Sequence, residues 1–453
     1  MSARESAPKT VRPDFVPREG YLSKDYVQLE KERMWPKVWQ VACRLEEIPN
    51  VGDYVTFDVI DESIIVTRLT GDKIKAYYNV CQHRGRRLTA GCGHATKFHC
   101  NYHGWQWNLD GSVLRILDEQ DWAGCPSMSH EELALKEVLV DTWGGFVFIN
   151  MDPSAEPLAK YLAPVPEITD CYEFENMRYR WYKSVRLPCN WKVALEAFNE
   201  GYHVAATHPQ ILDTQGDDVT RSFAFGKHGM FDYSTATRLP GTPSPRTGKP
   251  IPEDIRPGMV KFYQIMEDQL KAIFTDRDNE ATKRLLTEVE PTQDQMLVLG
   301  KAMQFQVEAA IADGAGWPNI SMEQMMRAGT DWHVFPNLVF LLYPDGALFY
   351  RARPDGDNPD SCIYDIWSLK RYAPGKEPKL EREFYHGVDD WKNDTVKNFG
   401  LILSQDFQNM GQVQMGMKSR GFAGSRTNPL QESSISNFHR ELQEYIYGTE
   451  SAQ

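Results

Sequence analysis

The chain has 453 residues, of which 41% are hydrophobic and 25% are charged, a balance typical of soluble globular enzymes with more than one core. Its formal net charge of −13 argues against a nucleic-acid-binding surface, which needs a basic stripe, and indicates a solvated acidic surface instead. Eight cysteines are too few for a disulfide scaffold of this length, so we expect free thiols or metal ligands.

The first residues, up to about position 20, are polar and proline-rich and lack the apolar centre of a secretory signal. The longest apolar runs, Phe146–Ile149 and Leu338–Tyr343, are far too short to span a bilayer. We therefore expect a cytoplasmic protein without a membrane partner.

Short strands are predicted from about residue 40 to residue 155, after a helical segment that begins near Ser23. Residues 51–69 alternate in polarity and are rich in β-branched side chains, and turn signals follow at 71–73 and 109–112. This block predicts a compact all-β domain.

Strand and helix patterns are mixed beyond about residue 155. Residues 194–208 predict a helix, residues 210–330 have only a loose pattern, strands follow between 331 and 372, and a final helical run begins near 380. Strands grouped together and then closed by helices predict an α+β fold rather than a wound parallel sheet.

Four residues in the first block have the spacing of a metal site: Cys81, His83, Cys100 and His103. The pattern is C-x-H, sixteen residues, and then C-x-x-H. Two thiolates and two imidazoles that converge from two short loops suit either a zinc ion or a mixed-ligand iron–sulfur cluster. Zinc fingers of the Cys2His2 type place their second pair on a helix, whereas strand-like sequence flanks both pairs here.

A second group lies in the predicted helix 194–208. Glu200 and His203 are three residues apart and would share a helical face. Pro209 disfavours helical geometry at His208, so the helix should end there and let His208 fold back. The two histidines fit two corners of a 2-His-1-carboxylate site for Fe(II), although two unrelated histidines on one helix would have the same spacing.

The residues around the first group resemble the Rieske signature of aromatic-ring-hydroxylating oxygenase large (alpha) subunits: Cys-x-His-Arg-Gly, followed by Cys-x-Tyr-His-Gly-Trp. The resemblance implies a [2Fe–2S] cluster in which Cys81 and Cys100 hold one iron and His83 and His103 hold the other. Asn101 departs from the pattern, because many members have proline or serine there. Histidine ligands raise the reduction potential of such a cluster, which suits an electron relay.

The second group resembles the catalytic-iron segment of the same family, which has Asn-Trp-Lys, Glu-x-Tyr-His and His-Pro in this order. The implied ligands of a mononuclear Fe(II) are His203, His208 and Asp406, the last because it precedes a Val-Gln-x-Gly stretch. Glu200 is implied to orient His203 and to bridge to His103 of the partner subunit, which implies a homotrimer.

On spacing alone, three other aspartates are also candidates for the third ligand: Asp389, Asp390 and Asp394. The alternative interpretation of these three is that they lie on the solvated surface. Ala197 is a departure from the family, where relatives often have asparagine. The interval from His208 to Asp406 is longer than the family leads us to expect, so an insertion or lid is predicted within residues 210–330.

The resemblance covers nearly the whole chain and implies an α+β fold, with an all-β Rieske domain inserted in a helix-grip catalytic domain of antiparallel sheet plus helices. The expected regions are an N-terminal arm and helix that pack with the catalytic domain (1–39), the Rieske [2Fe–2S] domain (40–155) and the catalytic mononuclear iron domain (156–453).

The implied activity is that of a terminal oxygenase that uses O₂ and electrons from NADH to hydroxylate an aromatic substrate, by cis-dihydroxylation. A ferredoxin, a flavin reductase or both would deliver the electrons, and a small beta subunit could accompany the trimer. One alternative is a monooxygenase or demethylase that acts on a quaternary ammonium or other polar substrate. A more distant alternative is a non-catalytic, zinc-stabilised binding protein.

Overall fold

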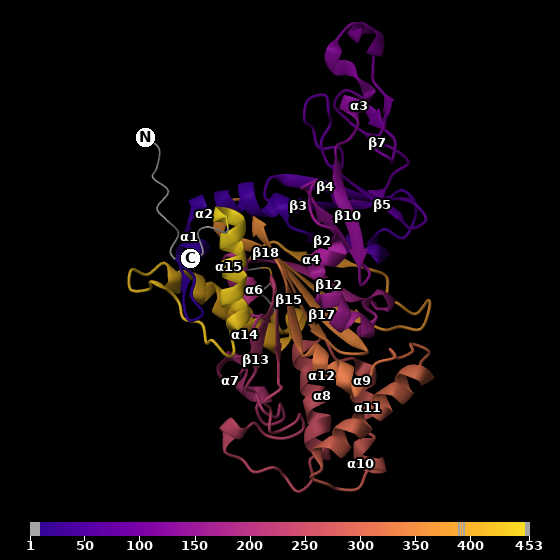
Figure 1. Cartoon of the computed structure of the whole chain (residues 1–453). Helices are drawn as coiled ribbons and strands as arrows, with labels where there is room; N and C mark the ends of the chain where they lie inside the picture. The colour runs from indigo at the N-terminus through magenta and orange to yellow at the C-terminus, as the bar shows by residue number, and fades with distance from the viewer. Residues whose placement is uncertain (1–9, 388–389, 391, 393–394, 449–453) are drawn as a thin grey trace. The chain divides into compact units, whose positions relative to one another are not determined.

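The chain divides into two compact units, one of residues 30–161 and one of residues 1–29 with 162–453 (Figure 1). The smaller unit begins at Glu30, upstream of the β domain predicted at 40–155. In the described residues, no helix is both long enough and apolar enough to cross a membrane. The computed structural model describes residues 10–387, 390, 392 and 395–448.

The smaller unit is built from two antiparallel sheets, as its alternating sequence predicts. The first sheet has the order β2-β11-β10-β5-β4-β3-β6 and the second has the order β7-β8-β9. The strands are β2 (Gln40–Arg44), β3 (Asp53–Val59), β4 (Glu62–Thr70), β5 (Lys73–Tyr78), β6 (Cys92–His94), β7 (Phe98–His99), β8 (Gln106–Trp107), β9 (Val113–Arg115), β10 (Glu137–Trp143) and β11 (Phe146–Asn150). Short helical segments are η1 (Glu30–Met34), η2 (Trp35–Lys37), η3 (Leu45–Glu47), η4 (Glu119–Trp122), η5 (Pro126–Met128), α3 (His130–Leu133) and α4 (Leu158–Leu162).

The larger unit contains an eight-stranded sheet with the order β13-β14-β15-β16-β17-β18-β12-β19. Neighbouring strands are antiparallel except for the parallel pair β12 and β19. The α+β prediction is therefore confirmed. The strands are β12 (Arg178–Leu187), β13 (Arg221–Phe225), β14 (His228–Asp232), β15 (Asp331–Val334), β16 (Leu338–Leu342), β17 (Gly346–Asp355), β18 (Asn358–Lys370) and β19 (Arg382–Tyr385), and a separate pair joins β1 (Val16–Pro17) to β20 (Gly424–Ser425).

One face of this sheet is covered by α6 (Trp191–Glu196), α14 (Thr395–Met417) and α15 (Ser433–Tyr447) (Figure 1). The α6 helix packs on β17 and β18, and α15 packs on β13 and β14. We call this the helix-covered face; the strand register places Tyr350, Tyr364 and Asp331 on it. The remaining helical segments are α1 (Glu19–Leu22), α2 (Lys24–Leu29), α5 (Val165–Thr169), η6 (Asp170–Tyr172), η7 (Phe174–Asn176), α7 (Val204–Thr207), η8 (Pro209–Ile211), η9 (Pro245–Thr247), α8 (Arg256–Leu270), α9 (Asp276–Thr282), α10 (Leu285–Glu288), α11 (Gln295–Ala312) and α12 (Met322–Ala328).

The opposite face of the sheet carries a fully paired buried charge. Asp365 is 0% exposed and accepts hydrogen bonds from Arg351 at 2.7 and 2.9 Å and from Arg353 at 2.9 Å. Burial acts to raise the pKa of Asp365, but the two guanidinium groups outweigh it and lower the pKa below the usual carboxyl range. Ser184 donates a further hydrogen bond to the same carboxylate at 2.5 Å.

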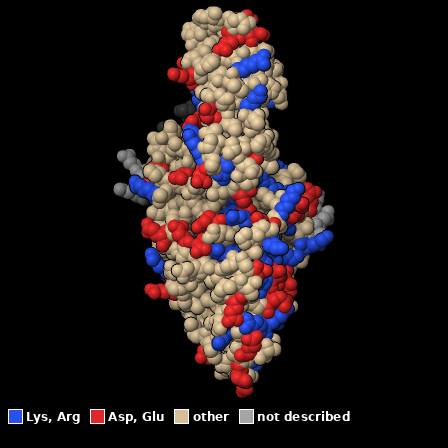
Figure 2. Space-filling model, turned by 90° about the vertical axis from the view of Figure 1, so that its right-hand side faces the viewer, with Lys and Arg blue, Asp and Glu red and all other residues tan. Residues whose placement is uncertain are grey.

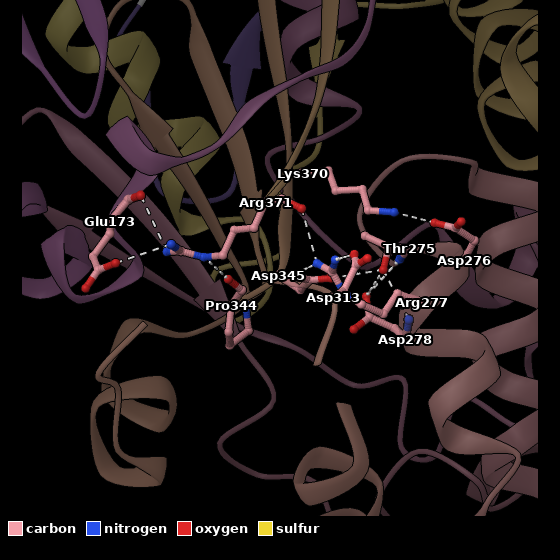
Figure 3. Close-up of polar contacts among 10 residues, drawn as sticks. All are labelled: Glu173, Thr275, Asp276, Arg277, Asp278, Asp313, Pro344, Asp345, Lys370 and Arg371. Atoms are coloured by element: carbon pink, nitrogen blue, oxygen red, sulfur yellow. Dashed lines mark hydrogen bonds and ion pairs between the residues drawn. The ribbon is translucent and has the colours of Figure 1, made fainter. Parts of the chain in front are cut away.

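The loosely patterned stretch 210–330 contains the helices α8 to α12, which gather near one end of the sheet (Figure 1). Helices α8 to α11 share an apolar core of their own that includes Met259, Phe262, Val298 and Phe305. Ion pairs attach this helical cluster to the ends of the strands (Figure 3). Those pairs are Arg277 with Asp345 and Asp276 with Lys370, while Arg277 also pairs with Asp313 at the end of α11.

A second carboxyl group, Asp278, lies beside this attachment (Figure 3). The Thr275 hydroxyl is 2.8 Å from Asp278 Oδ2 and 3.0 Å from Asp345 Oδ2. Burial and the neighbouring charge of Asp345 raise the pKa of Asp278 to about 8. Because a single hydroxyl proton cannot serve two carboxylates, a protonated Asp278 stabilises this arrangement.

The face of the molecule drawn in Figure 2 carries acidic and basic side chains mixed together. Among its described residues, no basic stripe dominates that face. The chain as a whole has a formal net charge of −13.

Candidate metal centres

The first predicted site is formed by two loops of the smaller unit, one between β5 and β6 and one between β7 and β8. The loops have matching backbones: Cys81 N–H donates to Arg86 O at 2.8 Å, and Cys100 N–H donates to Trp105 O at 2.9 Å. In each loop the amide of a glycine (Gly85 or Gly104) donates back to the cysteine carbonyl at 3.0 Å, and both glycines have a φ of +74°. The glycine at this left-handed position closes the turn in both loops.

The thiols of Cys81 and Cys100 are buried, at 3% and 1% exposure, and lie close enough to influence each other's pKa. Burial acts to raise the pKa of both thiols. The backbone amides of His83 and Arg84 donate hydrogen bonds to the Cys81 sulfur, and those of Tyr102 and His103 donate to the Cys100 sulfur. These hydrogen bonds favour the thiolate form. The balance raises the pKa of Cys81 and lowers that of Cys100.

The two histidines of the pattern face each other, with ring centroids 4.4 Å apart. His83 also stacks on Trp105 with centroids 4.8 Å apart and an interplanar angle of 10°. The buried Nδ1 of His83 has no hydrogen-bond partner among the described residues. Two converging thiols, amide donors and an unsatisfied imidazole nitrogen fit a cluster held by two cysteines and two histidines.

The predicted continuous helix over 194–208 is wrong. Helix α6 ends at Glu196, the chain turns through residues 197–203, and the one-turn helix α7 (Val204–Thr207) follows. In the turn, Glu200 Oε2 accepts a hydrogen bond from the backbone amide of His203 at 3.0 Å. The side chains of Glu200 and His203 nevertheless meet, through this turn rather than along one helical face.

His203, His208 and Asp406 come together from two distant segments of the larger unit. One ligand atom from each residue lies within 4.8 Å of the others, and these three form the sole such group of histidine, cysteine or acidic residues in the described chain. Asp406 Oδ1 is 3.0 Å from His208 Nε2 and 3.6 Å from His203 Nε2. The spacing of these atoms would suit a single metal ion between them.

Hydrogen bonds at the far side of each ring fix which nitrogen is free for a metal. His203 Nδ1 lies 2.6 Å from Glu200 Oε1, and His208 Nδ1 lies 2.9 Å from Gln405 Oε1. Both partners accept, so each Nδ1 carries the proton and each Nε2 has a free lone pair toward Asp406. Gln405 is held in turn by Gln210, whose Nε2 donates to it at 2.8 Å.

The acidic member of the group, Asp406, is 3% exposed, and its Oδ2 has no hydrogen-bond partner in the described chain. A buried carboxylate oxygen without a donor is costly unless a cation balances it, so the residues fit a bound Fe(II). Burial lowers the pKa of His203, but the carboxylates of Glu200 and Asp406 outweigh it and raise the value to about 9. A proton and a metal ion would therefore compete for this histidine.

Helix α14 places Asp406 in this group. The helix is interrupted at Gly400, whose φ is +80°, and a Cβ there would lie 2.1 Å from the carbonyl oxygen of Gln269. Only glycine fits this close approach to α8. Of the competing aspartates, Asp390 is exposed and accepts from the backbone amide of His386 at 3.1 Å, while Asp389 and Asp394 lie outside the described residues.

A cavity of about 290 Å³ adjoins this group. Its lining includes Glu200, His203 and Asp406, together with two acidic residues that the sequence did not single out, Glu196 and Glu432. Burial raises the pKa of Glu432 to about 7, and the charges of Glu200 and Glu196 add to this effect. The cavity is therefore acidic in character.

A family model described as "Ring hydroxylating alpha subunit (catalytic domain)" matches residues 174–448, and one described as "Rieske [2Fe-2S] domain" matches residues 38–126. The chain belongs to the ring hydroxylating alpha subunit family. The family resemblance stated from the motifs is thus confirmed, and so are the two kinds of cofactor expected of this Rieske-type oxygenase family, a [2Fe–2S] cluster and a mononuclear iron.

Several members of this family are similar to the chain. The carnitine monooxygenase oxygenase subunit of Escherichia coli K12 is 32% identical over 202 residues, 44% of this chain and 53% of that protein. The glycine betaine monooxygenase oxygenase subunit of Pseudomonas aeruginosa UCBPP-PA14 is 30% identical over 208 residues (45% and 48%). The benzene 1,2-dioxygenase subunit alpha of Pseudomonas putida F1 is 30% identical over 193 residues (41% and 42%). The chain thus spans about half the length of the curated relatives it matches.

The fold of the family extends over the whole chain. The crystal structure of the quaternary ammonium Rieske monooxygenase CntA in complex with L-carnitine has a TM-score of 0.64 and 18% sequence identity, and the alignment covers 96% of this chain and 97% of that one. The predicted fold, a Rieske domain together with an antiparallel sheet covered by helices, is confirmed by this similarity.

Two polar residues next to the second centre had not been found from the sequence. Gln405 immediately precedes Asp406, but its contact with His208 requires the packing of α14 against a segment 197 residues earlier in the chain. Gln210 lies two residues after His208 and holds Gln405. Both partners come from tertiary packing, and neither belongs to a local sequence pattern.

Proposed function

We propose that the chain is the oxygenase component of a Rieske monooxygenase that hydroxylates a small quaternary ammonium compound. One atom of O₂ would enter a C–H bond of the substrate as a hydroxyl group, and the other would leave as water, with two electrons and two protons consumed. The observation that carries the proposal is the convergence of His203, His208 and Asp406 beside an acidic cavity.

The residues would share the work between the two centres. Cys81, Cys100, His83 and His103 would hold the [2Fe–2S] cluster, and the triad would hold the mononuclear iron. When bound, the cluster supplies single electrons and the iron activates O₂. Glu200 would position His203 through its 2.6 Å contact with Nδ1.

The charge around the triad supports a cationic substrate. Four carboxylates line the cavity: Glu196, Glu200, Asp406 and Glu432. The single lysine or arginine in the lining is Arg426. A negative potential of this kind attracts cations and repels anions. The relatives named for carnitine and glycine betaine point to the same substrate class.

The second candidate is cis-dihydroxylation of an aromatic compound, the reaction first expected from the sequence. The observation that favours it is an apolar stack on the helix-covered face, where Phe198 lies 4.2 Å from Tyr350 and 5.7 Å from Tyr364 between ring centroids. The similarity to a benzene dioxygenase subunit supports it as well. The comparisons favour the quaternary ammonium reaction over this one.

The proposal includes partners. A flavin reductase, with or without a ferredoxin, would transfer electrons from NADH, and the chain would work as a homotrimer, with or without a small beta subunit. Within such a trimer, Glu200 would also contact His103 of the partner subunit. Sedimentation analysis of the purified chain and copurification with a reductase test these expectations.

Turnover of a substrate panel tests the reaction itself. The purified chain, supplied with NADH and a reductase, is expected to consume O₂ in the presence of L-carnitine or glycine betaine and to form a hydroxylated product or its cleavage products. Indole and benzene are the matched aromatic substrates. Turnover confined to the aromatic compounds, with a cis-diol as product, would overturn the proposal in favour of the second candidate.

The role of Glu200 is tested by Glu200→Gln, which keeps the size of the side chain and an acceptor oxygen but removes the charge. We expect both metal sites to stay filled and the cluster still to be reduced, while its reoxidation by O₂ in the presence of substrate slows by about 100-fold, within the range found for partners of metal-bound histidines. Glu441→Gln, at a partly buried acid on α15, is the control. Wild-type reoxidation in Glu200→Gln would show that the charge is not needed.

A further inference from the structure

Asp331, the first residue of β15, is a buried acid without a hydrogen-bonding partner. Its exposure is 1%, and neither Oδ1 nor Oδ2 has a hydrogen-bond partner among the described residues. Its backbone is paired on both sides, with Phe231 of β14 and Leu341 of β16, so the strand position is well defined. The sheet therefore holds a carboxyl group inside the larger unit with both oxygens unsatisfied.

The charges that act on Asp331 are negative. Burial raises the pKa of Asp331 well above its usual range, and the charge of Glu200 adds to the effect. In the described chain, no lysine or arginine is among the groups whose charge acts on it. An isolated carboxylate in such surroundings is strongly unfavourable, so either a proton or a cation from outside the chain must balance it.

Two tyrosines share one face of the sheet with this carboxyl group. Tyr350 and Tyr364 share the helix-covered face with Asp331, and in both the pKa is raised well above its usual range, mainly by burial, with the charges of Asp406 and Asp331 adding to the effect. Tyr233 responds to the charges of both Asp331 and Glu200. The charge of Glu200 thus acts on Asp331, and the charges of Asp331 and Asp406 act together on Tyr350 and Tyr364.

We propose that Asp331 is a specificity-determining residue whose carboxylate receives the positively charged nitrogen of the substrate, with the tyrosine rings of the helix-covered face beside it. The inference rests on the proposed function and names the group that would select the substrate class. A quaternary ammonium group has a charge but no N–H to donate, and it is bound in proteins by carboxylates and by aromatic rings. Binding would supply the cation that the chain itself does not place next to Asp331.

A different explanation is that Asp331 balances the charge of the bound iron. This explanation predicts that neutralising Asp331 lowers the iron content, whereas substrate selection by Asp331 predicts an unchanged iron content and a changed preference between ligands. The two therefore differ in a quantity that can be measured before any turnover.

The test compares equilibrium binding of two ligands of the same shape to the holoenzyme. Glycine betaine has a trimethylammonium group, and 3,3-dimethylbutanoate has a tert-butyl group in the same position without the charge. Asp331→Asn is nearly isosteric; it should weaken the binding of glycine betaine by roughly 100-fold, because it removes one member of a buried charge pair. Binding of 3,3-dimethylbutanoate should change by less than about threefold, since its tert-butyl group carries no charge to lose.

Tetramethylammonium separates this inference from the proposed function. It should bind to wild type and bind at least tenfold more weakly to Asp331→Asn, even if glycine betaine and L-carnitine are not turned over. Asp278→Asn, at another buried aspartate whose pKa is raised, is the matched control and should bind all three ligands as wild type does. Asp331→Glu keeps the charge and should retain most of the preference for the cation.

Three results would overturn the inference: unchanged binding of glycine betaine and tetramethylammonium in Asp331→Asn, equal weakening of the charged and uncharged ligands, or loss of iron from the variant with the ligand preference intact. Iron content and the thermal melting temperature of each variant are measured alongside, so that misfolding is recognised directly.

Discussion

Each face of the eight-stranded sheet carries a buried aspartate, and the two aspartates differ in whether a cation balances their charge. On one face Asp365 is held by Arg351 and Arg353 and ionises readily; on the helix-covered face Asp331 has no partner in the described chain, and burial opposes its ionisation. Both are essentially inaccessible to solvent. Equal burial therefore leaves Asp365 with its charge balanced inside the chain and Asp331 without a balancing cation among the described residues.

The largest effect is expected at Asp406, a second buried acid, one oxygen of which has no hydrogen-bond partner in the described chain. Asp406→Ala should lose the mononuclear iron and all turnover, because two histidines alone do not complete the metal site. Acid-labile sulfide and the cluster absorption should stay at wild-type levels, and iron analysis should show one iron fewer per chain. Normal hydroxylation by this variant would mean that another carboxylate is the ligand.

On the opposite face, Arg351→Met should reduce stability without acting on the chemistry. It leaves the buried Asp365 without one of its two cations, and the expected loss is about 3–5 kcal/mol in the free energy of unfolding. Denaturant unfolding of the larger unit measures it. Arg284→Met, which breaks the exposed pairs with Glu288 and Glu308, is the control and should have a much smaller effect. An equal loss of unfolding free energy in the two variants would show that the buried ion pair contributes no more to stability than the exposed pairs.

A smaller effect is expected where a neutral side chain supports the metal centre. Gln405→Leu removes the acceptor for His208 Nδ1 and should weaken iron binding by about 10- to 100-fold. Gln408→Leu, on the exposed side of the same helix, is the control. Iron affinity measured by competition with a chelator should separate the two variants; if they behave alike, the hydrogen bond does not position the ligand.

A further effect concerns Asp278, which burial and the neighbouring charge of Asp345 keep protonated. Its pKa is raised to about 8 in the folded chain, whereas in the unfolded chain it ionises near 4, so the folded state binds the proton more tightly. Stability from this group is therefore full below about pH 4 and is lost as the pH rises toward 8, by at most about 1.4 kcal/mol per pH unit. Asp278→Asn should flatten the decline of the melting temperature between pH 6 and pH 8. A parallel decline in both proteins would show that Asp278 does not titrate there.

The first candidate metal site could be proposed from the sequence because its four residues lie between positions 81 and 103, on two loops with a local pattern. His203 and His208 were found in the same way. The grouping of Asp406 with them needed the family resemblance, since Asp406 comes from α14, and the surroundings of Asp331 and the contacts of Gln405 are set by strand register and helix packing. No local pattern carries that information.

The fold shows the same division between local and tertiary signals. The alternating strands of the smaller unit were predicted, whereas the helices of residues 210–330 were not, because buried polar residues such as Asp278 and Gln306 blur their apolar faces. The helical run expected from about 380 is wrong at its start. Residues 382–385 form β19, an exposed edge strand whose conformation is decided by pairing with β12 rather than by its own composition.

The two histidines of the second centre differ in one respect that follows from their hydrogen bonds. His203 donates to a carboxylate, Glu200, whereas His208 donates to the neutral amide of Gln405. An anionic acceptor draws the imidazole proton more strongly and makes the opposite nitrogen a stronger electron donor. His203 would therefore be the stronger nitrogen donor of the two toward a bound iron, and His208 the weaker.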